Sequence, residues 1–190
     1  MSCHEAPRVR AHGPATGVAE LRTERLCLRP ARADDLAALH GILSDARATA
    51  YWSTPPHTDL AQTRDWLQSM IEIPSHEGED FVVEFQGRVI GKAGLYRFPE
   101  IGFILDPAAW GRGFASEAVG AVLERAFTRH ALGEVLADVD PRNERSLRML
   151  TRLGFEECGR AQWTWRVGDE WCDSVYLRLT VEAWQRHAAR

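Results

Sequence analysis

The chain has 190 residues, 45% of them apolar, and its formal net charge is −4 at pH 7. That length suits one large domain with a single hydrophobic core, and two full domains are not expected. The acidic balance argues against a protein built around nucleic-acid phosphates, and no apolar run approaches the roughly 18 residues of a membrane span.

Residues 1–18 are rich in Pro, Gly, Arg and His and lack the apolar segment of a signal peptide. We expect them to be a flexible tail that precedes one domain over residues 19–190. The four cysteines, Cys3, Cys27, Cys158 and Cys172, are scattered, without a C-x-x-C pair or histidines at metal spacing. Reduced thiols, a cytoplasmic location and no bound metal are therefore expected.

In the first half of the chain, the spacing of apolar residues predicts a strand over 21–30, helices over 33–45 and 59–73, and strands over 81–85, 88–96 and 101–105. In the second half it predicts a helix over 113–129, a strand over 134–140 and a helix over 143–154. Strands over 155–165 and 172–180 and a closing helix over 181–190 follow. The two-residue turn Gln86-Gly87 makes the strands beside it antiparallel. The strand–helix–strand segment 101–139 should be parallel and right-handed. This order predicts a mixed α/β domain.

The segment WGRGFASEA, residues 110–118, places two glycines between a strand and a helix. A helix N-terminus presents unpaired N–H groups, and glycine lets an anion approach the main chain, so the segment predicts a phosphate cradle. A tight turn without a ligand is the alternative interpretation. Ser116 stands where a dinucleotide fingerprint needs Gly or Ala, and no G-K-[ST] is present, so neither standard nucleotide motif fits.

Residues 100–127, EIGFILDPAAWGRGFASEAVGAVLERAF, resemble the acetyl-CoA-binding core of the GCN5-related N-acetyltransferase (GNAT) superfamily. Gly113 and Ala115 match the last two positions of its Q/R-x-x-G-x-G/A pattern, while Trp110 replaces the usual Gln or Arg. NERSLRMLTRLGFEECG, from Asn143, is similar to the second motif of the RimJ/RimL-type branch, which acetylates ribosomal-protein N-termini. The similarity spans about residues 21–187.

The resemblance implies the GNAT fold: a mixed, mostly antiparallel sheet of about six or seven strands, with helices on both faces. The fourth and fifth strands, 101–105 and 134–140, should splay apart. Acetyl-CoA would be the cosubstrate, with its diphosphate on the main chain of Gly111, Arg112, Gly113, Phe114, Ala115 and Ser116. The Arg112 side chain either adds charge near the phosphates or is an ordinary surface arginine.

The rest of the cofactor would run alongside Ile104 and Leu105. Asn143 would contact its pantetheine arm, and Ser146 would lie near the sulfur and supply a proton. Helix capping is the alternative role for both residues. Many superfamily members use a tyrosine acid at this helix or directly after it, and none of the three tyrosines here, Tyr51, Tyr96 and Tyr176, stands at that position.

The acceptor amine must be neutral to react. An α-amine has a pKa of about 8 and a lysine side chain about 10.4, so the terminal amine needs less help from a base. Glu100 is the first choice for that base, with an exposed turn carboxylate as the alternative interpretation, and Glu84 is the reserve. Tyr51, Trp52 and His57 are expected in a loop over the acceptor, although ordinary core packing also explains Trp52.

We therefore expect an N-acetyltransferase that moves acetyl directly from acetyl-CoA to a primary amine, with a protein N-terminus favoured. A small-molecule amine such as an antibiotic or polyamine, and a non-catalytic acyl-CoA sensor, are the alternatives. A nicotinamide oxidoreductase is a more remote one. Neither nucleic acid nor membrane is an expected partner, and the tryptophan-rich hairpin over 163–171 makes a homodimer plausible.

Overall fold

The computed structural model describes residues 20–188. The predicted tail, residues 1–18, lies outside the described residues. One eight-stranded sheet has the order β1-β2-β3-β4-β5-β6-β8-β7. Its strands are β1 (Leu21–Arg22), β2 (Leu26–Arg29), β3 (Glu79–Phe85), β4 (Arg88–Arg97), β5 (Glu100–Leu105), β6 (Glu134–Val139), β7 (Glu156–Val167) and β8 (Glu170–Thr180). The helices are α1 (Leu36–Leu43), α2 (Leu60–Ile71), α3 (Phe114–Thr128), α4 (Glu144–Arg152) and α5 (Val181–Ala188).

The mixed, mostly antiparallel sheet confirms the predicted fold class, with one difference at its start. The predicted first strand is two short strands, because the chain reverses where the Thr23 N–H donates to the Leu26 carbonyl at 3.0 Å. β1 then pairs back on β2, with Leu21 opposite Leu28. The sheet therefore has eight strands rather than six or seven.

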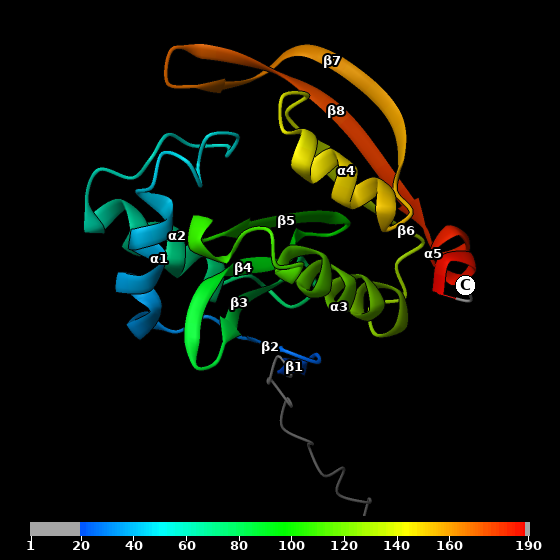
Figure 1. The fold of residues 1–190 in the computed structure, drawn as a ribbon, viewed down its shortest axis with the longest axis horizontal. Coiled ribbons are helices and arrows are strands. Elements are labelled where there is room, and N and C mark those ends of the chain that lie inside the picture. The colour runs from blue at the N-terminus through cyan, green and yellow to red at the C-terminus, as the bar shows by residue number, and fades with distance from the viewer. Residues whose placement is uncertain (1–19, 189–190) are drawn as a thin grey trace, which may run out of the picture.

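Helices cover both faces of the sheet, as neighbouring residues of β3 show. Val82 belongs to a buried apolar cluster with α1 and α2 residues. Phe81 and Val83 belong to the main core, which also contains the buried side of α3. Because successive strand residues point to opposite faces, α1 and α2 cover one face and α3 covers the other (Figure 1).

β5 and β6 are the only parallel neighbours in the described sheet, and they separate almost at once. Their pairing is confined to Glu100 opposite Leu136. On its other edge β5 stays paired with β4 along its length, to Leu105 opposite Gly91. The two strands therefore diverge from the start of β5 towards Leu105, and this confirms the predicted splay between residues 101–105 and 134–140.

The hairpin of β7 and β8 is long and curves away from the body of the domain above α4 (Figure 1). β8 pairs with β6 through Glu134 to Val139, so the hairpin extends the sheet beyond the splay. No helix within residues 20–188 has the length and apolarity needed to cross a membrane.

Candidate functional site

A cleft of about 1650 Å³ occupies the splay. The end of β5, the loop before α3 and the first turn of α4 line it, and so do the loop after α1 and the inner side of the β7–β8 hairpin. Small-ligand pockets usually measure roughly 300–1,000 Å³, so this cleft has room for a large ligand and a second molecule.

The glycine loop, residues 110–113, forms one wall. Gly111 and Gly113 have φ of 75° and 80°, a left-handed conformation that glycine adopts without strain. A β-carbon on Gly111 would meet nothing within 4 Å. α3 makes its first backbone bond from the Glu117 N–H to the Gly113 carbonyl, so the N–H groups of 114–116 have no partner within the helix. This wall suits an anion.

Side chains hold the first turn of α3 in place from outside the cleft. The Glu117 carboxylate accepts hydrogen bonds from the Thr23 hydroxyl at 2.5 Å and the Arg25 main-chain N–H at 2.9 Å. The Arg112 guanidinium lies over the rings of Phe85 and Phe114, 4.7 and 4.5 Å from their centroids. Arg112 is not among the residues that line the cleft. The Arg112 side chain therefore packs on aromatic rings outside the cleft, which fits the surface interpretation.

The opposite wall contains Asn143 and Ser146, which line the cleft together with Ile104 and Leu105. Asn143 caps α4, since its side-chain oxygen accepts from the Ser146 N–H at 3.2 Å. The capping role does not keep Asn143 and Ser146 out of the cleft, because capping places both side chains at the N-terminal end of α4.

The acceptor chamber is the part of the cleft bounded by Lys92, Tyr96, Gly102 and Trp52. The register places Lys92 beside Ile104 and Gly94 beside Gly102 on the face covered by α1 and α2. Gly102 leaves this face of β5 bare, and a β-carbon there would lie 3.2 Å from the Tyr96 ring and 3.4 Å from Lys92 Nζ. The missing side chain therefore creates the hollow.

A buried ion pair forms the floor of this chamber. Lys92 Nζ donates to Asp80 Oδ2 at 2.8 Å, and both side chains are 3% exposed. Burial raises the pKa of Asp80, and the charge and hydrogen bond of Lys92 oppose that change. Lys92 Nζ also lies 5.5 Å from the centroid of the Trp52 ring and 5.7 Å from that of Tyr96, within the range of a cation–π contact.

Tyr96 connects the chamber to Glu100. Tyr96 lines the cleft and Glu100 does not, but the Tyr96 hydroxyl donates to the Glu100 carboxylate. Burial and this hydrogen bond raise the pKa of Tyr96, and the charge of Asp138 across the splay adds to the effect. Glu100 also accepts from Arg97 at 2.6 Å. The phenol is therefore neutral, and it separates Glu100 from the cleft.

Of the other four residues predicted to contact the acceptor, two line the cleft and two do not. Tyr51 and Trp52 line the cleft, whereas His57 and Glu84 do not. His57 Nδ1 lies 2.9 Å from the Thr63 hydroxyl, where its pKa is lowered by burial and then by His40. The placement of His57 in the acceptor site was wrong, because its ring packs against α2 instead.

Glu84 was also misplaced, both as reserve base and as acceptor contact. Its carboxylate accepts from Arg29 Nε at 2.8 Å. Arg29 is held in turn by Asp35, whose Oδ1 lies 2.6 Å from Arg29 Nη2. Glu84 thus belongs to an ion-pair cluster that ties β2 and β3 to the start of α1.

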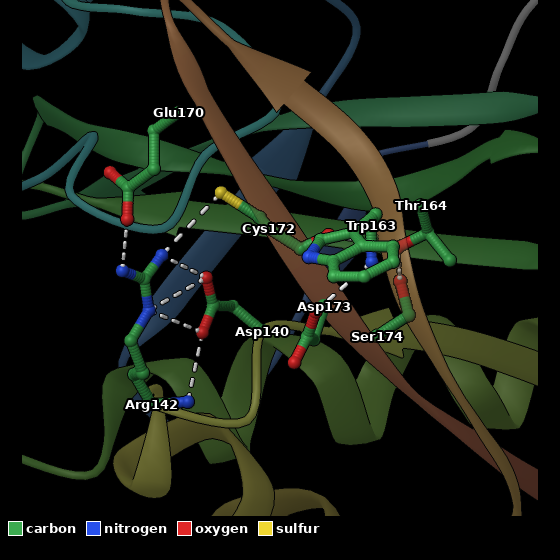
Figure 2. Close-up of polar contacts among 8 residues, drawn as sticks. All are labelled: Asp140, Arg142, Trp163, Thr164, Glu170, Cys172, Asp173 and Ser174. Carbon is green, nitrogen blue, oxygen red and sulfur yellow. Dashed lines mark hydrogen bonds and ion pairs between the residues drawn. The ribbon is translucent and has the colours of Figure 1, made fainter.

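Arg142 joins three parts of the cleft rim (Figure 2). Its guanidinium binds Asp140 at 2.6 Å and Glu170 at 2.5 Å, and Nη2 lies 3.4 Å from Cys172 Sγ. It also lies 5.8 Å from the centroid of the Tyr51 ring. The loop before α4, the hairpin and the loop after α1 therefore meet at this one side chain.

Further along the hairpin, polar contacts fix its two strands to each other (Figure 2). The main-chain N–H of Trp163 donates to Asp173 Oδ1 at 3.0 Å, and the hydroxyl oxygens of Thr164 and Ser174 lie 2.6 Å apart. Trp163 itself is 70% exposed. The predicted homodimer stays a prediction.

Sequence reasoning missed Asp80, Lys92, Tyr96 and Asp138, all of which line the cleft. One signal was available for Lys92, which is the only charged residue in the otherwise apolar and glycine segment VIGKAGL, residues 89–95. A charged residue in a central strand needs a buried partner. The partner itself, Asp80, follows only from strand register.

The family model described as Acetyltransferase (GNAT) domain matches residues 25–156. The chain is 37% identical over 149 residues to the uncharacterised N-acetyltransferase p20 of Bacillus licheniformis, covering 73% of this chain and 83% of that protein. It is 25% identical over 156 residues to the spermidine N(1)-acetyltransferase of Escherichia coli K12, covering 79% and 83%. The solved structure of Mycobacterium smegmatis RimJ in complex with CoA-disulfide matches with a TM-score of 0.72 at 24% identity, covering 86% of this chain and 88% of that one.

Proposed function

This chain belongs to the GNAT acetyltransferase family, and we propose that it transfers the acetyl group of acetyl-CoA to the α-amine of a protein N-terminus. The observation that carries the proposal is the splay itself. It brings an anion-binding helix N-terminus and a chamber with a tyrosine–carboxylate pair into one cleft. A direct transfer needs both substrates in such a cleft at the same time.

The glycine loop fits the diphosphate of acetyl-CoA. The two left-handed glycines and the unbonded N–H groups at the start of α3 present donors without obstructing side chains. From there the pantetheine arm would pass Ile104 and Leu105 on one side and Asn143 on the other. Main-chain N–H groups of β5 that lose their β6 partner in the splay would donate to the thioester oxygen as negative charge grows on it.

The reaction is an attack of the amine nitrogen on the thioester carbon, which breaks the carbon–sulfur bond and leaves CoA as a thiol. One proton must leave the amine, and one must reach the sulfur. Tyr96 would take the amine proton on its oxygen while it passes its own proton to Glu100, to which its hydroxyl already donates. Ser146, which lines the cleft, would give its hydroxyl proton to the sulfur as the carbon–sulfur bond breaks and would regain a proton from solvent.

The protein N-terminus is favoured over lysine by the chemistry of the amine. At neutral pH an α-amine with a pKa of about 8 is neutral far more often than a side chain with a pKa of about 10.4. Glu100 would accept the proton only through the Tyr96 hydroxyl, so it would be a weak general base. A weak base suits an α-amine, which needs less help to lose its proton than a lysine side chain does. A small-molecule amine is the second candidate, because a spermidine acetyltransferase is among the relatives.

Release of CoA thiol tests the proposal. The protein is mixed with acetyl-CoA and either an alanine-starting peptide, the same peptide with a blocked N-terminus, or spermidine. We expect thiol release and a gain of one acetyl mass with the free peptide only. Acetyl-CoA binding without thiol release from any amine would instead identify a non-catalytic sensor.

A further inference from the structure

The acceptor chamber presents hydrogen-bond donors that lack protein acceptors. A lysine ammonium carries three N–H groups. Among residues 20–188, Lys92 Nζ makes one hydrogen bond, to Asp80, although the residue is only 2% exposed. A buried charged donor with unused N–H groups is costly unless a ligand or water accepts from it. The remaining N–H groups of Lys92 are therefore available to donate to an oxygen atom inside the chamber.

Trp52 provides a second donor of the same kind. Its indole Nε1 is buried and has no hydrogen-bond partner in the described part of the chain. The ring of Trp52 is the one that faces Lys92 Nζ at 5.5 Å, and Trp52 lines the cleft. Two donors without acceptors thus belong to neighbouring side chains of one chamber.

The carboxylates of the cleft, by contrast, already have donors. The lining carboxylates are Asp80, Asp138, Asp140, Glu144, Glu170 and Asp173. Asp80, Asp140, Glu144 and Glu170 pair with Lys92, Arg142 or Arg148. Asp138 accepts a hydrogen bond from the indole N–H of Trp165, and Asp173 accepts one from the main-chain N–H of Trp163. Four of the six carboxylates are thus paired with a cation, whereas Asp138 and Asp173 accept from neutral donors and keep their charge.

We infer that the chamber recognises an α-amino acyl group, with Lys92 Nζ and Trp52 Nε1 donating to the carbonyl oxygen next to the reacting amine. This inference rests on the proposed function and adds the feature by which the acceptor is selected. The oxygen belongs to the first peptide bond of a protein or to the carboxylate of a free amino acid.

The test compares alaninamide with the branched alkylamine in which methyl groups replace its amide oxygen and nitrogen. Rates are expressed as kcat/KM per concentration of neutral amine, because the alkylamine has the higher pKa. A hydrogen bond to a charged group predicts a preference for alaninamide of about 10- to 100-fold. Equal use of the two amines would overturn the inference and leave the proposed function standing, whereas no turnover of any amine would overturn both.

Variants at Lys92 and at Trp52 locate the recognition. Lys92→Met should reduce the preference to about threefold or less, and the double variant D80N/K92M should do the same without leaving Asp80 unpaired. Trp52→Phe keeps a ring over Lys92 and removes only the N–H, so it should lose part of the preference. Trp66→Phe, in the same wall, is the matched control and should keep all of it. An unchanged preference in D80N/K92M would exclude Lys92 as the donor.

A peptide and a free amino acid separate the two sources of the oxygen. An alanine-starting tripeptide should be used at least as well as alaninamide, and free alanine more slowly. Faster use of free alanine would support recognition of the oxygen but overturn the protein N-terminus as the acceptor. Use of spermidine by the wild type at a rate similar to that of the tripeptide would contradict selection by the carbonyl oxygen, because spermidine has none.

Discussion

Tyr96 stands between Glu100 and the cleft, and its hydroxyl donates to the Glu100 carboxylate. The side chain that faces the cleft is therefore a phenol, and the carboxylate lies one hydrogen bond behind it. Gly102 allows this arrangement, since a side chain there would crowd the Tyr96 ring.

Glu100→Gln should lower kcat at pH 7 by about 100-fold, the usual contribution of a general base. The deficit should shrink as the pH rises towards about 8, where the α-amine loses its proton without help. Tyr96→Phe should show the same pH dependence, because both variants interrupt one proton route. Glu157→Gln, which removes an exposed carboxylate paired with Arg160 in the hairpin, is the matched control. A constant deficit across the pH–rate profile would exclude Glu100 as the base.

Gly111→Ala should raise the KM for acetyl-CoA by about tenfold or more. The substitution strains a left-handed residue by roughly 1–2 kcal/mol and puts a methyl group where the diphosphate is proposed to lie. Gly168→Ala is the control, because Gly168 has φ of 60° in the hairpin turn and does not line the cleft. Similar KM values for both variants would show that strain alone explains the effect.

Acid should destabilise the fold through Glu79. Burial opposes the ionisation of Glu79, but hydrogen bonds from Arg125 and His130 outweigh it and hold the pKa below its ordinary value of 4.5. The ionised carboxylate thus stabilises the folded state above about pH 4.5, and this contribution is lost as the pH falls through the lower folded pKa. Urea unfolding at a series of pH values measures it.

Glu79→Gln should reduce the free energy of unfolding at pH 7 by about 3 kcal/mol, because Arg125 is left buried without its partner. Its stability should also fall less steeply below pH 4.5 than that of the wild type. An identical acid slope in both proteins would assign acid sensitivity to other carboxylates, such as Asp35.

Arg142→Lys should loosen the β7–β8 hairpin. Lysine keeps the charge but cannot hold Asp140 and Glu170 at once with a planar fork. We expect a loss of about 1 kcal/mol locally and a severalfold faster hydrogen–deuterium exchange in the hairpin. Arg160→Lys, which alters an exposed pair on the same hairpin, should exchange like the wild type. Unchanged exchange in Arg142→Lys would show that the strands alone fix the hairpin.

Local signals in the sequence were enough for the elements that carry the glycine loop. Helical spacing and the glycine before Phe114 predicted α3 to within a residue of its observed bounds, 114–128. The cap residue Asn143 likewise marked the start of α4. These features depend on neighbours in the chain, and for that reason periodicity and capping chemistry reveal them.

The acceptor chamber depended on register instead. Asp80 and Lys92 meet because β3 and β4 pair with Val82 opposite Lys92, and the hollow exists because Gly102 lies beside Gly94. A slip of one residue would turn these side chains to the other face. Sequence spacing contains no such information, so it also misplaced His57 and Glu84.

The sequence by itself therefore determined most of the order of strands and helices, the family resemblance and the glycine loop before α3, because each depends on residues close together in the chain. Only the tertiary structure decided which polar groups face the cleft, with Tyr96 in front of Glu100 and Lys92 paired to Asp80. The physical reason is that burial and pairing are properties of contacts across the sheet.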